Sequence, residues 1–102
     1  MAFQVIWSPR ALRSLEEVLE PLRDQDPEAA RRVHDGVYET TAVLERFPFI
    51  GARYEPRRQL RSGFREVLFW QLRIFYRVDE PRQTVHIHLV WHGARDEPSL
   101  PE

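Results

Sequence analysis

The sequence predicts an α+β domain with the element order β-α-α-β-β-β, in which a helical hairpin packs on one face of a mainly antiparallel four-stranded sheet. Three observations lead to this prediction. Apolar residues in the first half recur at intervals of three and four, the period of amphipathic helices. From Gln59 onward the period changes to two, as in strands. The length of 102 residues, 42% of them apolar, fits a single domain over residues 1–102 with one compact core.

The chain opens with a short strand followed by a helix. Aromatic and β-branched residues over 3–7 predict the strand. Ser8 is a favourable N-cap, and Pro9 suits the first helical position because its missing N–H has no intrahelical partner there. Pro21 lies inside the helical pattern, so we expect it to kink or shorten the helix near its end. The apolar stripe consists of Leu12, Leu15, Val18 or Leu19, and Leu22.

A second helix repeats the same start signal at Asp26 and Pro27. About three residues separate the two helices, which predicts an antiparallel hairpin. The second helix should end near Arg46 and Phe47, because Pro48 disfavours helix at the preceding residue. Its apolar stripe consists of Ala30, Val33, Val37, Thr41 and Leu44.

A loop over 49–56 precedes three predicted strands, over 64–70, 72–78 and 85–91. Their short connections predict an antiparallel meander, and the first strand must join the same sheet because it is too short to stand alone. Alternation assigns the two faces of the sheet. The helices should cover Leu72, Ile74, Val78, Val85, Ile87, Leu89 and Trp91, and the opposite, uncovered face should present Arg73, Phe75, Arg77, His86 and His88 for binding.

Charge is distributed unevenly along the chain. Fifteen arginines, no lysine and sixteen acidic residues give a net charge of -1. Residues 1–50 carry -3, residues 51–95 carry +5, and the short acidic tail over 96–102 carries -3. This asymmetry predicts that the basic half binds phosphate or an acidic protein segment. The candidate binding residues are Arg53, Arg57, Arg58, Arg61, Arg65, Arg73, Phe75 and Arg77.

The histidines of the last strand are the other candidates for chemistry. His86 and His88 lie two residues apart and should share a face, whereas His92 is too distant to complete a metal site with them. We therefore predict no metal site. His92, with Arg95 three residues on, could transfer protons beside a phosphate, or it could be a capping or surface histidine.

Several classes of function are excluded by what the sequence lacks. It has no cysteine, no glycine-rich phosphate loop and no nucleophile or metalloprotease motif, so we expect no cofactor. It has no apolar run of about 20 residues and no readable signal peptide. We therefore expect no membrane association and a cytoplasmic location.

Taken in order, the motifs of the chain resemble the RelE/ParE superfamily of toxins from bacterial type II toxin–antitoxin systems. The resemblance covers nearly the whole chain and depends on the order and spacing of the motifs, since no single one is specific. They are V-I-W-S-P-R-A at the first helix start, P-E-A-A-R-R-V and L-E-R-F-P-F-I-G at the start and end of the second helix, R-E-V at Arg65, L-R-I-F-Y-R-V from Leu72 to Val78, and V-W-H-G-A-R-D from Val90 to Asp96.

This resemblance implies a small toxin in a hetero-oligomer with a cognate antitoxin, whose acidic and hydrophobic C-terminal segment wraps it. The superfamily contains two mechanisms. RelE-like members are ribosome-dependent endoribonucleases that cut mRNA with basic residues and often a C-terminal tyrosine or histidine. ParE-like members poison DNA gyrase and have no demonstrated hydrolytic chemistry. The fold hosts both functions and does not decide between them.

Residue by residue, the resemblance places Arg65, Arg73 and Arg95 where ribonuclease members have functional basic residues, with His92 as the proton-transfer group. Val67 stands where a further basic residue is expected, and residues 96–102 contain no tyrosine. Loss of a proton-transfer group costs about 100- to 10,000-fold in rate. The H-G-A-R-D and P-F-I-G segments favour the ParE-like interpretation. A RelE-like nuclease and a degenerate, non-toxic antitoxin-binding module are the alternatives.

Overall fold

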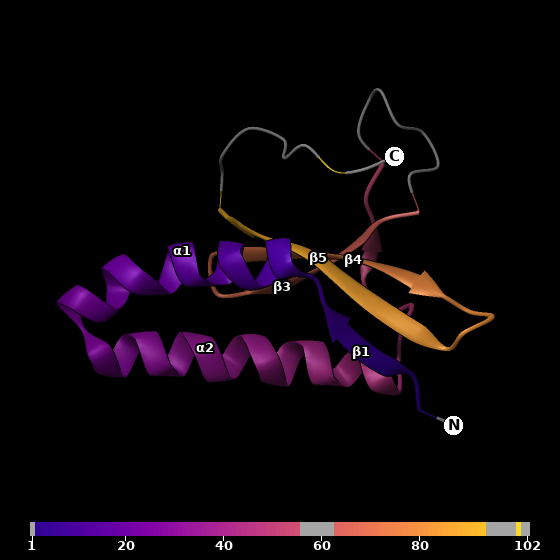
Figure 1. Cartoon of the computed structure of the whole chain (residues 1–102), viewed down its shortest axis with the longest axis horizontal. Helices are drawn as coiled ribbons and strands as arrows, with labels where there is room; N and C mark the ends of the chain where they lie inside the picture. The colour runs from indigo at the N-terminus through magenta and orange to yellow at the C-terminus, as the bar shows by residue number, and fades with distance from the viewer. Residues whose placement is uncertain (1, 56–62, 94–99, 101–102) are drawn as a thin grey trace.

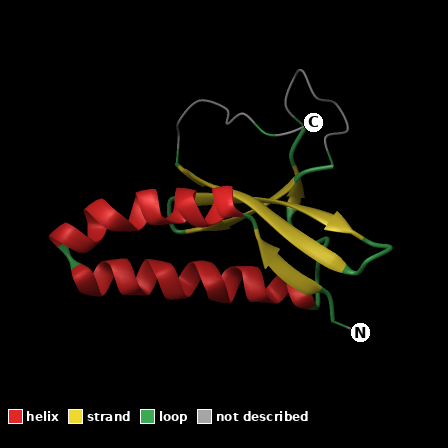
Figure 2. Ribbon diagram, in the orientation of Figure 1, coloured by secondary structure: helices red, strands yellow, loops and turns green. Residues whose placement is uncertain are grey.

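The structure, a computed structural model, describes residues 2–55, 63–93 and 100. Two helices lie side by side and cover one face of a single sheet, and their connected ends extend beyond it (Figures 1 and 2). The predicted α+β class is confirmed. The elements are β1 (Gln4–Trp7), α1 (Pro9–Gln25), α2 (Pro27–Ala42), a 3-10 turn (Val43–Glu45), β2 (Ala52–Arg53), β3 (Arg65–Phe69), β4 (Leu72–Asp79) and β5 (Thr84–His92).

Side-chain caps fix the helical hairpin, as the sequence predicts. Ser8 Oγ accepts a hydrogen bond from Ala11 N at 3.0 Å and begins α1. Asp26 alone joins the helices: its N–H donates to the carbonyl of Leu22 at 2.7 Å, and its carboxylate accepts from Ala29 N at 3.1 Å. The connection is thus shorter than the expected three residues, because one residue caps both helices.

The predicted helical stripes are largely buried, with one correction in α1. All five stripe residues of the second helix region are buried. Leu15 and Leu19 are also buried, but Leu12 is 46% exposed, because Ala11 takes its place in the core. Pro21 does not shorten α1, which continues to Gln25; one missing N–H is outweighed by the packed face.

Within the described residues the sheet has five strands in the order β1-β5-β4-β3-β2, so the prediction of four strands missed one. The extra strand is β2, two residues from the predicted loop that pair with β3. The sequence gives no signal for this strand, because two residues are too few to show alternation. The meander of β3, β4 and β5 is antiparallel as predicted, and β1 joins the sheet parallel to β5.

A bulge in β5 changes the predicted assignment of faces. Phe75 pairs with Leu89 while the next residue of β4, Tyr76, pairs with Ile87, which leaves His88 as an extra residue in β5. Alternation therefore reverses at His88. Val90 joins the core under the helices, whereas Leu89 and Trp91, predicted to face the helices, lie with Phe75 on the opposite face.

Consequently the described part of the chain forms two apolar clusters, one on each face of the sheet. The larger contains Leu15, Leu19, Val37, Ile74, Tyr76, Val85 and Ile87 and lies under the helices. The smaller, here called the second core, contains Tyr54, Phe64, Phe75, Leu89 and Leu100. None of the helices in the described ranges has the length and apolar character needed to cross a membrane.

Candidate functional site

The structure places four of the seven arginines between Arg53 and Arg77: Arg53, Arg65, Arg73 and Arg77. The other three, Arg57, Arg58 and Arg61, lie outside the described residues, as does Arg95. Strand register divides the four between the faces. Arg65 is opposite both Arg53 and Tyr76, so it shares the face of the larger core, whereas Arg73 is opposite Trp91 on the face of the second core. The predicted arginine surface is therefore not one continuous face.

Arg65 is bound to the turn that follows α2. Its Nη1 donates to the carbonyl oxygens of Phe49 and Gly51, at 3.2 and 2.9 Å. Its guanidinium also lies over the Phe49 ring, 5.2 Å from the centroid. This geometry makes Arg65 a support of the turn, with part of its donor capacity already used.

Arg73 is neutralised by a neighbouring carboxylate on the same face. Its Nη2 and Nε donate to the two carboxylate oxygens of Glu66, at 2.8 and 3.2 Å, in a bidentate ion pair. The guanidinium also lies 5.0 Å from the centroid of the Phe75 ring. A phosphate at Arg73 would have to compete with a carboxylate that is itself only 17% exposed.

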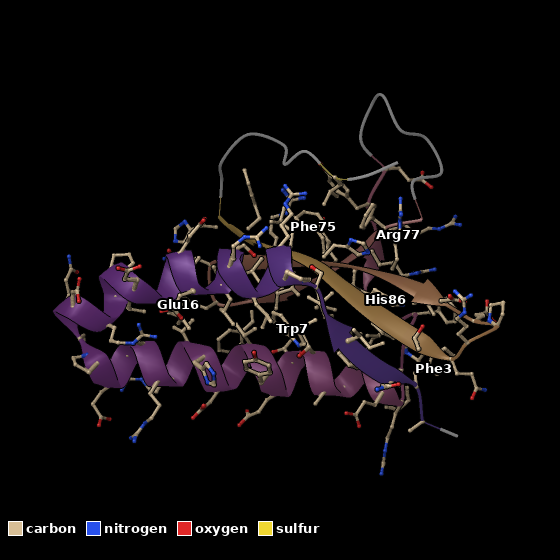
Figure 3. All side chains as sticks on the ribbon, in the orientation of Figure 1. Phe3, Trp7, Glu16, Phe75, Arg77 and His86 are labelled. Atoms are coloured by element: carbon tan, nitrogen blue, oxygen red, sulfur yellow. The ribbon has the colours of Figure 1, made fainter. Side chains whose placement is uncertain are left out.

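Arg77, His86 and His88 lie together beside the second core. Figure 3 shows Phe75 and Arg77 on the side of the sheet away from α2. Arg77 Cζ lies 4.0 Å from the centroid of the Phe64 ring, and burial lowers its pKa from the ordinary arginine value. Burial, followed by the positive charges of Arg77, His86 and Arg10, lowers the pKa of His88. A lowered pKa keeps the His88 imidazole neutral over more of the pH range, so Arg77 carries the permanent positive charge of this group.

Phe75 does not contribute to an exposed surface. It was predicted on the uncovered face, and it does lie there, but it is fully buried by the second core. Its ring meets Tyr54 edge-on at 4.8 Å between centroids. The sequence gives no signal for this burial, because Tyr54 and Leu100 come from segments with no strand or helix pattern.

The bulge separates His92 from the other two histidines. His92 pairs with Leu72 and therefore lies on the side of the larger core, and its ring is 6.0 Å from that of Trp70. Its proposed proton-transfer partner, Arg95, lies outside the described residues. Among the residues that are described, no three histidines, aspartates or glutamates are grouped to hold a metal ion.

A groove that the sequence analysis did not identify lies between α1 and the end of β5. We call it the α1 groove; it has a volume of about 690 Å³ and is lined by Arg10, Arg13, Glu17, Trp70, Trp91 and His92 among others. Arg10 and Arg13 are three residues apart and so share a helical face. That spacing is the one sign of the groove in the sequence. Only the tertiary fold brings β5 and Trp70 beside these two arginines.

No curated protein matches the chain in sequence. The solved structures that share its fold include two toxin–antitoxin systems. The RelBE2 toxin–antitoxin complex from Mycobacterium tuberculosis has a chain that is 22% identical, with a TM-score of 0.63 and coverage of 90% of this chain and 99% of that one. A chain of the chromosomal ParDE toxin–antitoxin system from P. aeruginosa is 17% identical, with a TM-score of 0.72 and coverage of 91% and 98%.

The sequence profile of one protein family matches residues 5–97, which include every helix and strand of the structure except the first residue of β1. The family is described as the ParE toxin of the type II toxin–antitoxin system parDE. This agrees with the resemblance found in the sequence and with the shared fold. The chain belongs to the ParE toxin family of type II toxin–antitoxin systems.

Proposed function

We propose that this chain is a ParE-like toxin that stops bacterial growth by poisoning DNA gyrase in the cytoplasm, and that a cognate antitoxin neutralises it. Membership of the ParE toxin family supports a toxin with an antitoxin partner. The choice of DNA gyrase as the target depends on whether the chain has the residues that an RNA-cleaving relative would need.

The choice of target rests on the contacts made by Arg65 and Arg73, the two arginines that a nuclease would use. Arg73 is neutralised by Glu66, and Arg65 donates to two backbone carbonyls. An RNase has to stabilise a developing negative charge on phosphate with preorganised, available donors. Arginines held in these contacts are better suited to supporting the fold, which favours the non-nuclease mechanism.

A supercoiling assay with the purified chain tests this proposal. Gyrase, relaxed plasmid and ATP should yield less supercoiled product as the chain is added, and linear DNA should accumulate because a poison traps the cleaved intermediate. The same plasmid incubated with the chain alone should stay intact. Absence of inhibition at micromolar concentration would contradict the gyrase target.

Primer extension on mRNA translated in the presence of the same purified chain tests the nuclease alternative. Cuts at codon positions, lost in Arg73→Ala, would replace the gyrase proposal by the RelE-like mechanism. Their persistence in His92→Ala would remove that histidine from the chemistry. Harmless expression without an antitoxin, together with no effect in either assay, would favour the degenerate binding module.

A further inference from the structure

Trp70 has an unusual backbone conformation for its side chain. It lies in the tight turn between β3 and β4 with φ of 55°, in the left-handed region that disfavours bulky residues. Gln83 shares this conformation, but its carbonyl accepts the N–H of Gln4, so its geometry serves the entry of β1. Trp70 instead leaves 53% of a large aromatic side chain exposed. A strained, exposed tryptophan where glycine fits better indicates a contact with another molecule.

Trp70 belongs to the lining of two hollows, and we call it the ridge between them. On one side is the α1 groove. On the other is a pocket of about 330 Å³ between the helices, which we call the hairpin pocket; its lining includes Leu22, Val33 and Phe69, with Arg32 at its side. A chain crossing this ridge could stack on the indole and place an apolar side chain in the hairpin pocket. Partly buried aromatic anchors of this kind dominate binding energy at interfaces.

The charges around the ridge select the chemistry of the partner. Arg10 and Arg13 line the α1 groove and Arg32 lines the hairpin pocket, against the single carboxylate of Glu17. Within the ranges that the structure covers, none of these three arginines forms an ion pair. An acidic segment would therefore find arginines that are not already neutralised, unlike Arg73.

We propose that Trp70 is the anchor on which an acidic and apolar segment of the cognate antitoxin docks, with its acidic side chains at Arg13 and Arg32 and an apolar side chain in the hairpin pocket. This inference rests on the proposed function only in assuming that an antitoxin exists. It assigns the docking surface to α1, the α2 start and the β3–β4 turn, separate from the arginines of the second core face.

Calorimetric titration with the purified product of the adjacent reading frame tests the inference. Trp70→Gly should keep the fold, since glycine adopts the left-handed conformation freely, yet weaken binding about 30-fold or more. Trp70→Asn, which also tolerates that conformation, should behave alike and guards against a folding artefact. The matched control is Leu68→Ala on the same hairpin: Leu68 is 67% exposed but lines neither hollow, and its loss should change affinity less than threefold.

The charge component has its own measurement. The double variant Arg13→Glu, Arg32→Glu should weaken binding at least about tenfold and reduce the salt dependence of the affinity. Equal affinity of the wild type and both folded Trp70 variants would overturn the inference and leave the proposed function intact. If the wild-type chain itself fails to bind the neighbouring gene product, the antitoxin assignment fails and the inference fails with it.

Discussion

Tyr76 links the larger core to the turn that Arg65 supports. Its side chain is fully buried, and its hydroxyl accepts a hydrogen bond from Gly51 N at 2.9 Å. A Cβ at Gly51 would lie 2.5 Å from that hydroxyl and 2.7 Å from the carbonyl oxygen of Glu66. Only glycine allows this close approach, so the P-F-I-G segment has a packing reason for its glycine.

Burial raises the pKa of the Tyr76 hydroxyl above its ordinary value of 10.0, against the opposing effects of the Gly51 N–H and the charge of Arg65. A raised pKa means that folding favours the protonated form, so this contribution is complete below pH 10 and is lost as pH rises beyond it. We expect the free energy of unfolding, from urea titrations between pH 8 and 11, to fall in the alkaline range.

The variant Tyr76→Phe should lose about 1 kcal/mol at pH 8, because Gly51 N–H loses its acceptor, and its stability should vary less above pH 10. Tyr38→Phe leaves the Gly51 bond in place and should retain the alkaline loss. An unchanged alkaline slope in Tyr76→Phe would show that another group causes it.

Among the elements, α2 and β3 meet at a position where a missing side chain decides the packing. Gly36 is buried in α2, and a Cβ built there would overlap the ring of Phe69 on β3. Glycine inside a helix costs about 1 kcal/mol relative to alanine. The sequence pattern marks Gly36 only as a weak helix former. The ring that requires a glycine there belongs to Phe69, 33 positions later in the chain.

We expect Gly36→Ala to destabilise the chain by about 1–3 kcal/mol, because overpacking outweighs the gain in helix propensity. Adding Phe69→Leu should recover part of the loss, and thermal melts of the four proteins of this cycle measure the coupling. Glu39→Ala on the exposed face of α2 is the control and should change stability by less than about 0.5 kcal/mol. A more stable Gly36→Ala variant would contradict the overlap.

The bulge at His88 limits what alternation alone can predict about a strand. The boundaries of β4 and β5 were predicted to within one residue at each end, and residues on the β1-paired part of β5 have the faces expected of them. Beyond His88 every face is reversed. A bulge is specified by the neighbouring strand and by the packing on both sides, so the sequence of β5 alone gives no signal for it.

For the whole molecule, two clusters share the central strands β4 and β5 and should therefore unfold together. Phe75 occupies the second core at 0% exposure, directly beside Ile74 and Tyr76 of the larger core. We expect Phe75→Ala to lose about 3–4 kcal/mol, while unfolding stays a single transition by circular dichroism and tryptophan fluorescence. Separate transitions for the two signals would show that the clusters are independent units. Phe47→Ala, at a side chain 59% exposed, should cost less than about 1 kcal/mol.

The sequence by itself determined the α+β class, the helix starts at Ser8 and Asp26, the antiparallel meander and the family, because these depend on local periodicity, caps and motif order. Only the tertiary structure decided which arginines are occupied by Glu66 and by backbone carbonyls, which face buries Phe75, and where Trp70 stands between two hollows. Those outcomes depend on contacts between residues far apart in the chain. A charge pattern shows how many cations a segment has, but its partners in the fold decide which of them are available to bind.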